Sequence, residues 1–249
     1  MLDAYFEKIQ EKLSLVMQSE QEGMEKVAAK VAQTIMCNGI IQLFGCGHSH
    51  ILTEEVFYRA GGLAPIKPIF IESLMLHEDA VRSSQLERQN HYAEEFLKHQ
   101  DIQPHDLVIV ISTSGLNPVP IDVALHAKDK GADVVGISSF QYIHSQPSRH
   151  RTGKYLSQVV DFALNNHANT GDATITYGNF GVPFGPTSTV VGASMLNGIF
   201  AEAIKIMINN DFEPPIFRSG NIEGADFHNQ QLIHKYRGRI PLLTQIENK

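Results

Sequence analysis

Apolar residues recur every three or four positions at the start of the chain and predict two amphipathic helices. The first covers about residues 2–16, and the second covers residues 24–35 and ends before Asn38-Gly39. A longer helix is predicted from residue 187 to about residue 209. This helix is apolar on more than one face, so other elements must cover it on several sides.

Short apolar runs follow the first two helices, and they predict buried strands. The runs are residues 40–44, 68–72, 106–112, 132–139 and 158–164. They are apolar throughout rather than alternating, which is typical of parallel strands covered on both faces. Helical or polar segments separate them, at residues 49–60, 74–99 and 117–130. The pattern predicts an α/β fold, a three-layer αβα sandwich around a five-stranded parallel sheet with flavodoxin-like strand order.

The same pattern divides the chain into one main domain with an addition at each end. Residues 1–38 form a helical extension, and residues 39–210 form the α/β domain. Residues 211–249 contain Pro214-Pro215 and no clear element, so we expect a tail that packs on the domain or on a partner subunit.

Composition narrows the class of protein. The chain has 249 residues, of which 43% are hydrophobic and 19% charged, as in a folded globular protein. Its net charge of −7 argues against nucleic-acid binding, which needs a basic face. Two cysteines fit neither a disulfide framework nor a zinc site, and no stretch resembles a signal peptide or a membrane span. We therefore expect a cytoplasmic protein that binds neither nucleic acid nor membrane.

The first candidate site follows the run at residues 40–44, because ligands of such sheets bind at the carboxyl ends of strands. Gly45-Cys46-Gly47-His48-Ser49 allows a tight turn, and Ser49 stands where a helix begins. Its hydroxyl and the free N–H groups can converge on one anion. An ordinary turn without ligand is one alternative. A dinucleotide site is another, although its signature needs glycine at His50; Glu72, ending the next strand, would then hold the ribose.

A second polar loop follows the run at residues 106–112. Ser112, Thr113 and Ser114 precede Gly115, and Asn117 is a good helix N-cap. A cap needs one such residue, so the surplus hydroxyls suit the several oxygens of a phosphate. Neither loop contains lysine or arginine, which leaves hydroxyls, N–H groups and helix dipoles for binding. The alternative is a polar turn with a helix cap.

Taken together, these motifs resemble the SIS (sugar isomerase) domain family. GCGHS matches its G-x-G-x-S motif, and STSGLNP is similar to its S-x-S-G-x-T motif. The resemblance spans roughly residues 20–210 and is strongest to stand-alone members such as phosphoheptose isomerases and N-acetylmuramic acid 6-phosphate etherases. It implies phosphate contacts from Gly47, His48, Ser49, Ser112, Thr113, Ser114, Asn117, Thr187 and Ser188.

The resemblance implies an aldose–ketose isomerase, or a related lyase, acting on a phosphorylated sugar without a cofactor. It also implies a homo-oligomer, dimer or tetramer, because relatives complete their sites across subunits. The alternatives are a non-catalytic sugar-phosphate sensor and a dinucleotide-binding protein. We expect no metal site; the alternative would use His48, His50 and Glu54.

The catalytic residues of those relatives do not carry over. Their glutamate follows the first-motif serine by nine or ten residues, where this chain has Tyr58 and Arg59. Isomerisation still needs a base, and Glu54 or Glu55 lies on the helix that starts at the phosphate loop. We therefore predict Glu55 or Glu54 as the base, with His77 as its partner.

Four further residues are expected to contact the sugar itself, from the first-motif helix and the ends of the second and fourth strands. They are His50, Arg59, Glu72 and Ser138. The basic loop at residues 144–154 is interpreted as solvated, with attraction of an anionic substrate or contact with another subunit as alternatives. The glycine-rich segment 171–187 is expected to cover the site.

Overall fold

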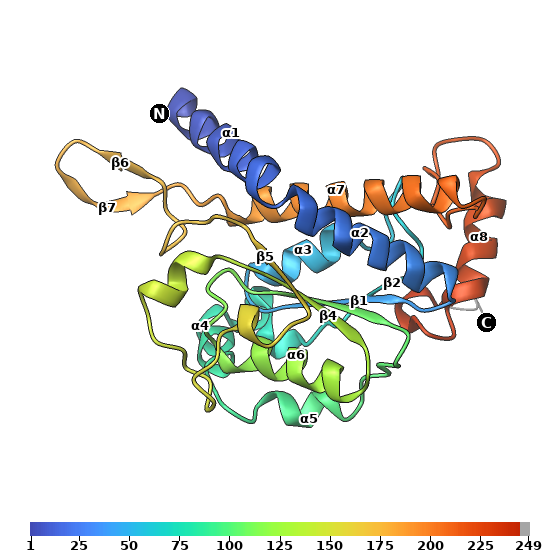
Figure 1. The fold of residues 1–249 in the computed structure, drawn as a ribbon, viewed down its shortest axis with the longest axis horizontal. Coiled ribbons are helices and arrows are strands. Elements are labelled where there is room, and N and C mark those ends of the chain that lie inside the picture. The colour runs from blue at the N-terminus through green and yellow to red at the C-terminus, as the bar shows by residue number, and fades with distance from the viewer. Residues whose placement is uncertain (245–249) are drawn as a thin grey trace.

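The computed structural model describes residues 1–244, and its centre is a five-stranded parallel sheet (Figure 1). The strand order is β2-β1-β3-β4-β5, so the predicted flavodoxin-like sheet is confirmed. The strands are β1 (Ile41–Gly45), β2 (Ile66–Pro68), β3 (Leu107–Ile111), β4 (Asp133–Ser138) and β5 (Phe162–Asn165). Gly45 lies opposite Ile111, which lies opposite Ile137, so three strands end level with one another.

One face of the sheet is covered by α2 (Gln21–Met36), α3 (Ser49–Glu55) and α7 (Ser188–Asn209) (Figure 1). The apolar stripes of α2 and α7 pack into one core with the inner faces of β1 and β3. The helix α1 (Leu2–Ser19) projects beyond this layer. The predicted boundary at residue 38, between a helical extension and the α/β domain, stays a prediction. The helix α2, which precedes this boundary, packs into the main core.

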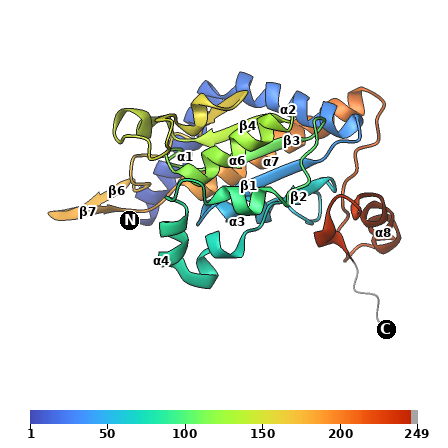
Figure 2. The ribbon, with the colours of Figure 1, turned by 90° about the horizontal axis from the view of Figure 1, so that it is seen from below.

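The other face is covered by α4 (Leu76–Leu86), α5 (Ala93–Leu97) and α6 (Pro118–Asp129) (Figure 2). Their core contains Phe44, whose ring stacks on Phe96 with centroids 5.9 Å apart. Short 3-10 turns connect the elements: η1 (Glu72–Leu74), η2 (Phe140–His144), η3 (Leu156–Gln158) and η4 (Pro241–Leu243).

Three predicted boundaries were wrong, and one of them is the strand predicted at residues 158–164, which begins only at Phe162. The run at residues 68–72 is apolar because Ile69 and Ile71 pack into the second core, whereas the strand itself, β2, covers residues 66–68 and ends directly before Ile69. The helix predicted at residues 49–60 ends at Glu55. Beyond it the chain turns to pair with a distant segment: the N–H of Gly61 donates to the carbonyl of Phe217 at 2.8 Å.

Periodicity missed two elements. A hairpin, β6 (Ile175–Tyr177) and β7 (Phe180–Phe184), projects from the body on the same side as α1 (Figures 1 and 2). In the tail, α8 (Ala225–Tyr236) packs against Ile40 and Ala64, just ahead of β1 and β2, and lies at the β2 end of the molecule in Figure 2. Its apolar contacts are few and unevenly spaced, since burial involves mainly Ala225, Ile233 and Tyr236, so its sequence carries no clear helical pattern.

The apolarity of α7 requires a further correction. By length and composition this helix could cross a membrane, contrary to the expectation that no segment could. In the structure its inner side lies in the core, where Val191, Met195 and Ile199 are buried. A core helix of this kind meets the same criteria as a membrane span.

Candidate functional site

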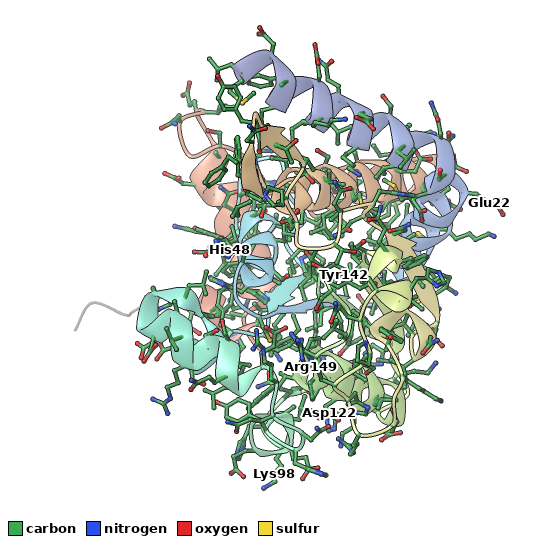
Figure 3. All side chains as sticks on the ribbon, turned by 90° about the vertical axis from the view of Figure 1, so that its left-hand side faces the viewer. Glu22, His48, Lys98, Asp122, Tyr142 and Arg149 are labelled. Atoms are coloured by element: carbon green, nitrogen blue, oxygen red, sulfur yellow. The ribbon has the colours of Figure 1, made fainter. Side chains whose placement is uncertain are left out.

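A cleft of about 370 Å³ lies at the carboxyl ends of β1 and β3. Figure 3 looks onto this end of the sheet, with His48 and Tyr142 labelled. The two predicted phosphate loops and the start of α7 form its walls. The lining residues are Cys46, Gly47, His48, Ser49, Leu76, Ser84, Glu87, Ser112, Thr113, Ser114, Asn117, Tyr142, Asp172, Pro186, Ser188 and Thr189.

The loop between β1 and α3 is a tight turn that only glycine permits at Gly45. A Cβ atom there would lie 2.5 Å from the carbonyl oxygen of Ser49. Under this turn His50 is buried, and its Nδ1–H donates to the carbonyl of Gly47 at 2.5 Å. The predicted substrate residue His50 therefore supports the loop and does not line the cleft, whereas His48 and Ser49 do.

The loop between β3 and α6 presents unused donors. In the part of the chain that the structure describes, the N–H groups of Thr113 and Ser114 donate to no protein acceptor. Gly115 has φ of +61°, and its N–H donates to the hydroxyl of Ser112 at 3.3 Å, which closes the turn. Asn117 is the N-cap of α6, as its sequence position predicted. The loop thus combines hydroxyls and free N–H groups, the donors a phosphate requires.

The basic loop after β4 folds against this second phosphate loop. Arg149 donates from Nη1 to Oδ1 of Asn117 at 2.8 Å, and its backbone N–H donates to the carbonyl of Leu116. His150 and Arg151 both contact the carboxylate of buried Asp122, at 3.0 and 2.7 Å. The interpretation as a merely solvated loop was therefore wrong, and Arg149 brings a positive charge to the edge of the cleft (Figure 3).

The start of α7 is already occupied by a carboxylate. Asp172 accepts the N–H groups of Thr187 and Ser188 on Oδ1, at 3.1 and 3.0 Å. Its Oδ2 accepts the hydroxyl of Ser188 at 2.6 Å. Thr187 is fully buried, does not line the cleft, and its Oγ1 has no hydrogen-bond partner within residues 1–244. The implied phosphate contacts at Thr187 and Ser188 stay a prediction: Ser188 lines the cleft, but both N–H groups and the Ser188 hydroxyl donate to Asp172.

A carboxylate that sequence reasoning missed lies in the cleft. Glu87 ends α4, and its backbone carbonyl accepts the N–H of Val119 at 3.3 Å, which holds it at the start of α6. Burial raises the pKa of Glu87, against the opposing hydrogen bond from Asn117 and the positive charges of Arg88 and Arg149. Burial and the charge of Glu87 also raise the pKa of the neighbouring Cys46 thiol, which therefore stays protonated.

The predicted bases lie elsewhere. The side chain of Glu54 is 67% exposed, and Glu55 is paired with Arg59. Glu54, Glu55 and Arg59 line a separate hollow on the outer side of α3. His77 is exposed on α4 and does not line the cleft. The structure thus does not bring Glu54, Glu55 or His77 to the phosphate loops. Glu54 and Glu55 lie on the outer side of α3, and His77 is exposed at the start of α4.

Three predicted substrate residues are also outside the cleft. Arg59 pairs with Glu55, and Glu72 is exposed in η1. Ser138 is buried at the end of β4, behind Gly115. The alternative metal site at His48, His50 and Glu54 is not assembled: residues 1–244 contain no group of three or more His, Cys, Asp or Glu that could hold a metal ion.

The glycine-rich segment 171–187 has two roles in the structure. Its ends reach the cleft through Asp172 and Pro186, whereas its middle is the projecting hairpin. Only the two ends of segment 171–187 therefore lie over the cleft, where the whole segment was expected to cover it. The sequence offered one usable signal for these two cleft carboxylates: Asp172 follows Gly171 in the loop that leads to the N-cap of α7. Glu87 carried no such signal, because it lies in a polar helical segment and resembles its neighbours.

Comparison with known proteins agrees with this architecture. The family model described as the SIS domain matches residues 4–139. A UPF0309 protein of Halalkalibacterium halodurans is 62% identical over 244 residues, which is 98% of each chain. A UPF0309 protein of Lysinibacillus sphaericus, named for its position in the nagA 3′ region, is 41% identical over 98% of this chain and 99% of its own.

Among solved structures, a phosphoheptose isomerase of Neisseria gonorrhoeae has a similar fold. Its TM-score is 0.50 at 12% identity, over 82% of this chain and 97% of its own. A phosphoheptose isomerase of Francisella tularensis gives the same TM-score and identity, over 82% and 96%. At this identity the likeness concerns the fold. The match over more than half of the sequence and the close full-length relatives show that the chain belongs to the SIS-domain family, among its UPF0309 members.

Proposed function

We propose that this protein binds a sugar monophosphate in the cleft and isomerises it between aldose and ketose. The observation that carries the proposal is the combination, in one cleft, of the free N–H groups of Thr113 and Ser114 with a half-buried carboxylate, Glu87. The hydroxyls of Ser49, Ser112 and Ser114 complete a phosphate-sized set of donors. Membership of the SIS-domain family and the fold shared with phosphoheptose isomerases support this assignment.

In this proposal Glu87 is the base. Isomerisation moves a proton from the carbon beside the carbonyl to the carbonyl carbon through an enediol. The Glu87 carboxylate accepts that proton and returns it to the neighbouring carbon, so it ends the cycle unchanged. His48 lines the same cleft and has both donor and acceptor nitrogens, which suits proton transfer between the two sugar oxygens.

Ser114→Ala tests the phosphate site. Losing a hydroxyl that donates to a charged phosphate is expected to cost about 1.5–3 kcal/mol of binding free energy. Titration calorimetry with hexose and pentose monophosphates measures it. Ser194→Ala is the matched control, because Ser194 is exposed on α7 and its hydroxyl donates to the carbonyl of Val190. Equal affinities of the two variants would place the phosphate elsewhere.

We further propose that the protein is a homo-oligomer, at least a dimer. The hairpin exposes Phe180, Val182 and Phe184, and α1 exposes Leu2 and Phe6 on the same side of the molecule (Figure 1). A two-stranded hairpin is marginally stable in water by itself, so a covering surface is required. Sedimentation velocity at micromolar concentration is expected to give a dimer or tetramer, and a monomer would contradict the proposal.

A further inference from the structure

The charges that line the cleft are of one sign. Glu87 and Asp172 are acidic, and within residues 1–244 no lysine or arginine lines the cleft. The nearby cation, Arg149, is hydrogen-bonded to Asn117 and acts from the edge. A phosphate bound by Thr113 and Ser114 is therefore held by neutral donors, and the rest of the ligand faces two carboxylates.

Asp172 is fixed in place. Three donors from the start of α7 hold its carboxylate, as described above. The preceding N–H, that of Gly171, donates to the hydroxyl of Tyr142 at 2.8 Å, and Tyr142 also lines the cleft. The 22-residue helix α7 points its positive end at this carboxylate, which stabilises the negative charge there.

This arrangement has two consequences for a ligand. The N–H groups of Thr187 and Ser188 and the hydroxyl of Ser188 already donate to Asp172, so these three donors cannot compensate a second anionic group. Such a group would also lie in a small cleft with the carboxylates of Glu87 and Asp172, where like charges repel. A neutral hydroxyl or a positively charged amino group meets neither obstacle, since both can donate hydrogen bonds to carboxylates.

We propose that the cleft selects sugar monophosphates whose other groups are neutral or positively charged, and that Asp172 sets this preference against a second anionic group. The proposal rests on the proposed function, because it takes the phosphate to lie at Thr113 and Ser114. It names the ligand class more narrowly: sugar bisphosphates and phosphorylated sugar acids are excluded.

Matched ligand pairs test the proposal by titration calorimetry of the whole protein. The pairs are glucose 6-phosphate with 6-phosphogluconate, fructose 6-phosphate with fructose 1,6-bisphosphate, and ribulose 5-phosphate with ribulose 1,5-bisphosphate. In each pair that binds, the monophosphate without the second anion is expected to bind at least about ten-fold more tightly. Asp172→Asn keeps an oxygen for the N–H groups of Thr187 and Ser188 but removes the charge, so this ratio is expected to fall severalfold.

Glu54→Gln is the control, because it removes the same charge from an exposed side chain outside the cleft and is expected to leave the ratio unchanged. Asp172→Ser, which also retains a capping oxygen, replaces Asp172→Asn if the latter unfolds. Equal affinity within the wild-type pairs, or a ratio unaltered by both Asp172 variants, would overturn the inference while the proposed function stands. Failure of every monophosphate to bind would instead defeat the proposed function, and this inference with it.

Discussion

Glu87→Gln is expected to lower the rate of proton exchange on a bound sugar phosphate by about 10²- to 10⁴-fold. The glutamine amide cannot accept the proton from carbon, whereas its size and its contact with Asn117 are preserved. Nuclear magnetic resonance in deuterated water measures the exchange directly, as deuterium incorporation beside the carbonyl. Monophosphate affinity is expected to change little, because the phosphate donors lie on the other loops.

The pH dependence of the wild-type rate gives a second view of the same residue. The base must be ionised, and burial raises the pKa of Glu87 above the ordinary value of a glutamate. The rate is therefore expected to rise with pH through an apparent pKa higher than that of an exposed glutamate, and to be lost on the acid side. Glu87→Gln is expected to remove this acidic limb from any residual rate.

Glu55→Gln is the matched control, because Glu55 is a glutamate paired with Arg59 outside the cleft. It is expected to keep the wild-type exchange rate. Normal exchange in Glu87→Gln together with a loss in Glu55→Gln would restore the first-motif helix as the source of the base. Binding without exchange in the wild type would favour a sugar-phosphate sensor.

Asp106→Ala is expected to lower the free energy of unfolding by about 3–5 kcal/mol. It breaks a buried ion pair and leaves several hydrogen-bond donors without an acceptor. Asp106 has a fully buried side chain and accepts from Nη2 of Arg239 at 2.7 Å. It also accepts from the backbone N–H of Ile40, Nε2 of Gln42 and the backbone N–H of Gln103, at 3.1, 2.9 and 2.9 Å. This one carboxylate therefore joins the amino ends of β1 and β3 to the segment that follows α8.

Urea unfolding followed by circular dichroism measures this loss. Asp129→Ala serves as the control, since Asp129 is exposed at the end of α6, and its effect is expected to stay within about 0.5 kcal/mol. The network lies at the end of the sheet opposite to the cleft, so the folded fraction of Asp106→Ala is expected to keep its ligand affinity. A stability equal to that of the control would show that the ion pair contributes nothing to folding.

The order of the main elements was determined by the sequence itself. Uninterrupted apolar runs such as residues 106–112 mark strands buried on both faces. Period-3.6 stripes mark α1 and α2, and a long stretch that is apolar on several faces marks α7. The two phosphate-loop motifs could also be predicted from the sequence, because glycine and clustered hydroxyl side chains have local conformational and hydrogen-bonding properties that do not depend on the rest of the fold. Both loops do line the cleft, with Ser49 and Ser114 among its residues.

What surrounds those loops was decided only by the tertiary structure. Glu87 reaches the cleft because the end of α4 contacts the start of α6. Asp172 accepts hydrogen bonds from the start of α7 because the loop that carries it folds back onto that helix. Glu54 and Glu55, close to the loop in sequence, point away because α3 is only seven residues long and its inner face packs on the core. Periodicity reports which face of an element is buried, but which distant side chain meets a site depends on contacts between elements far apart in the chain.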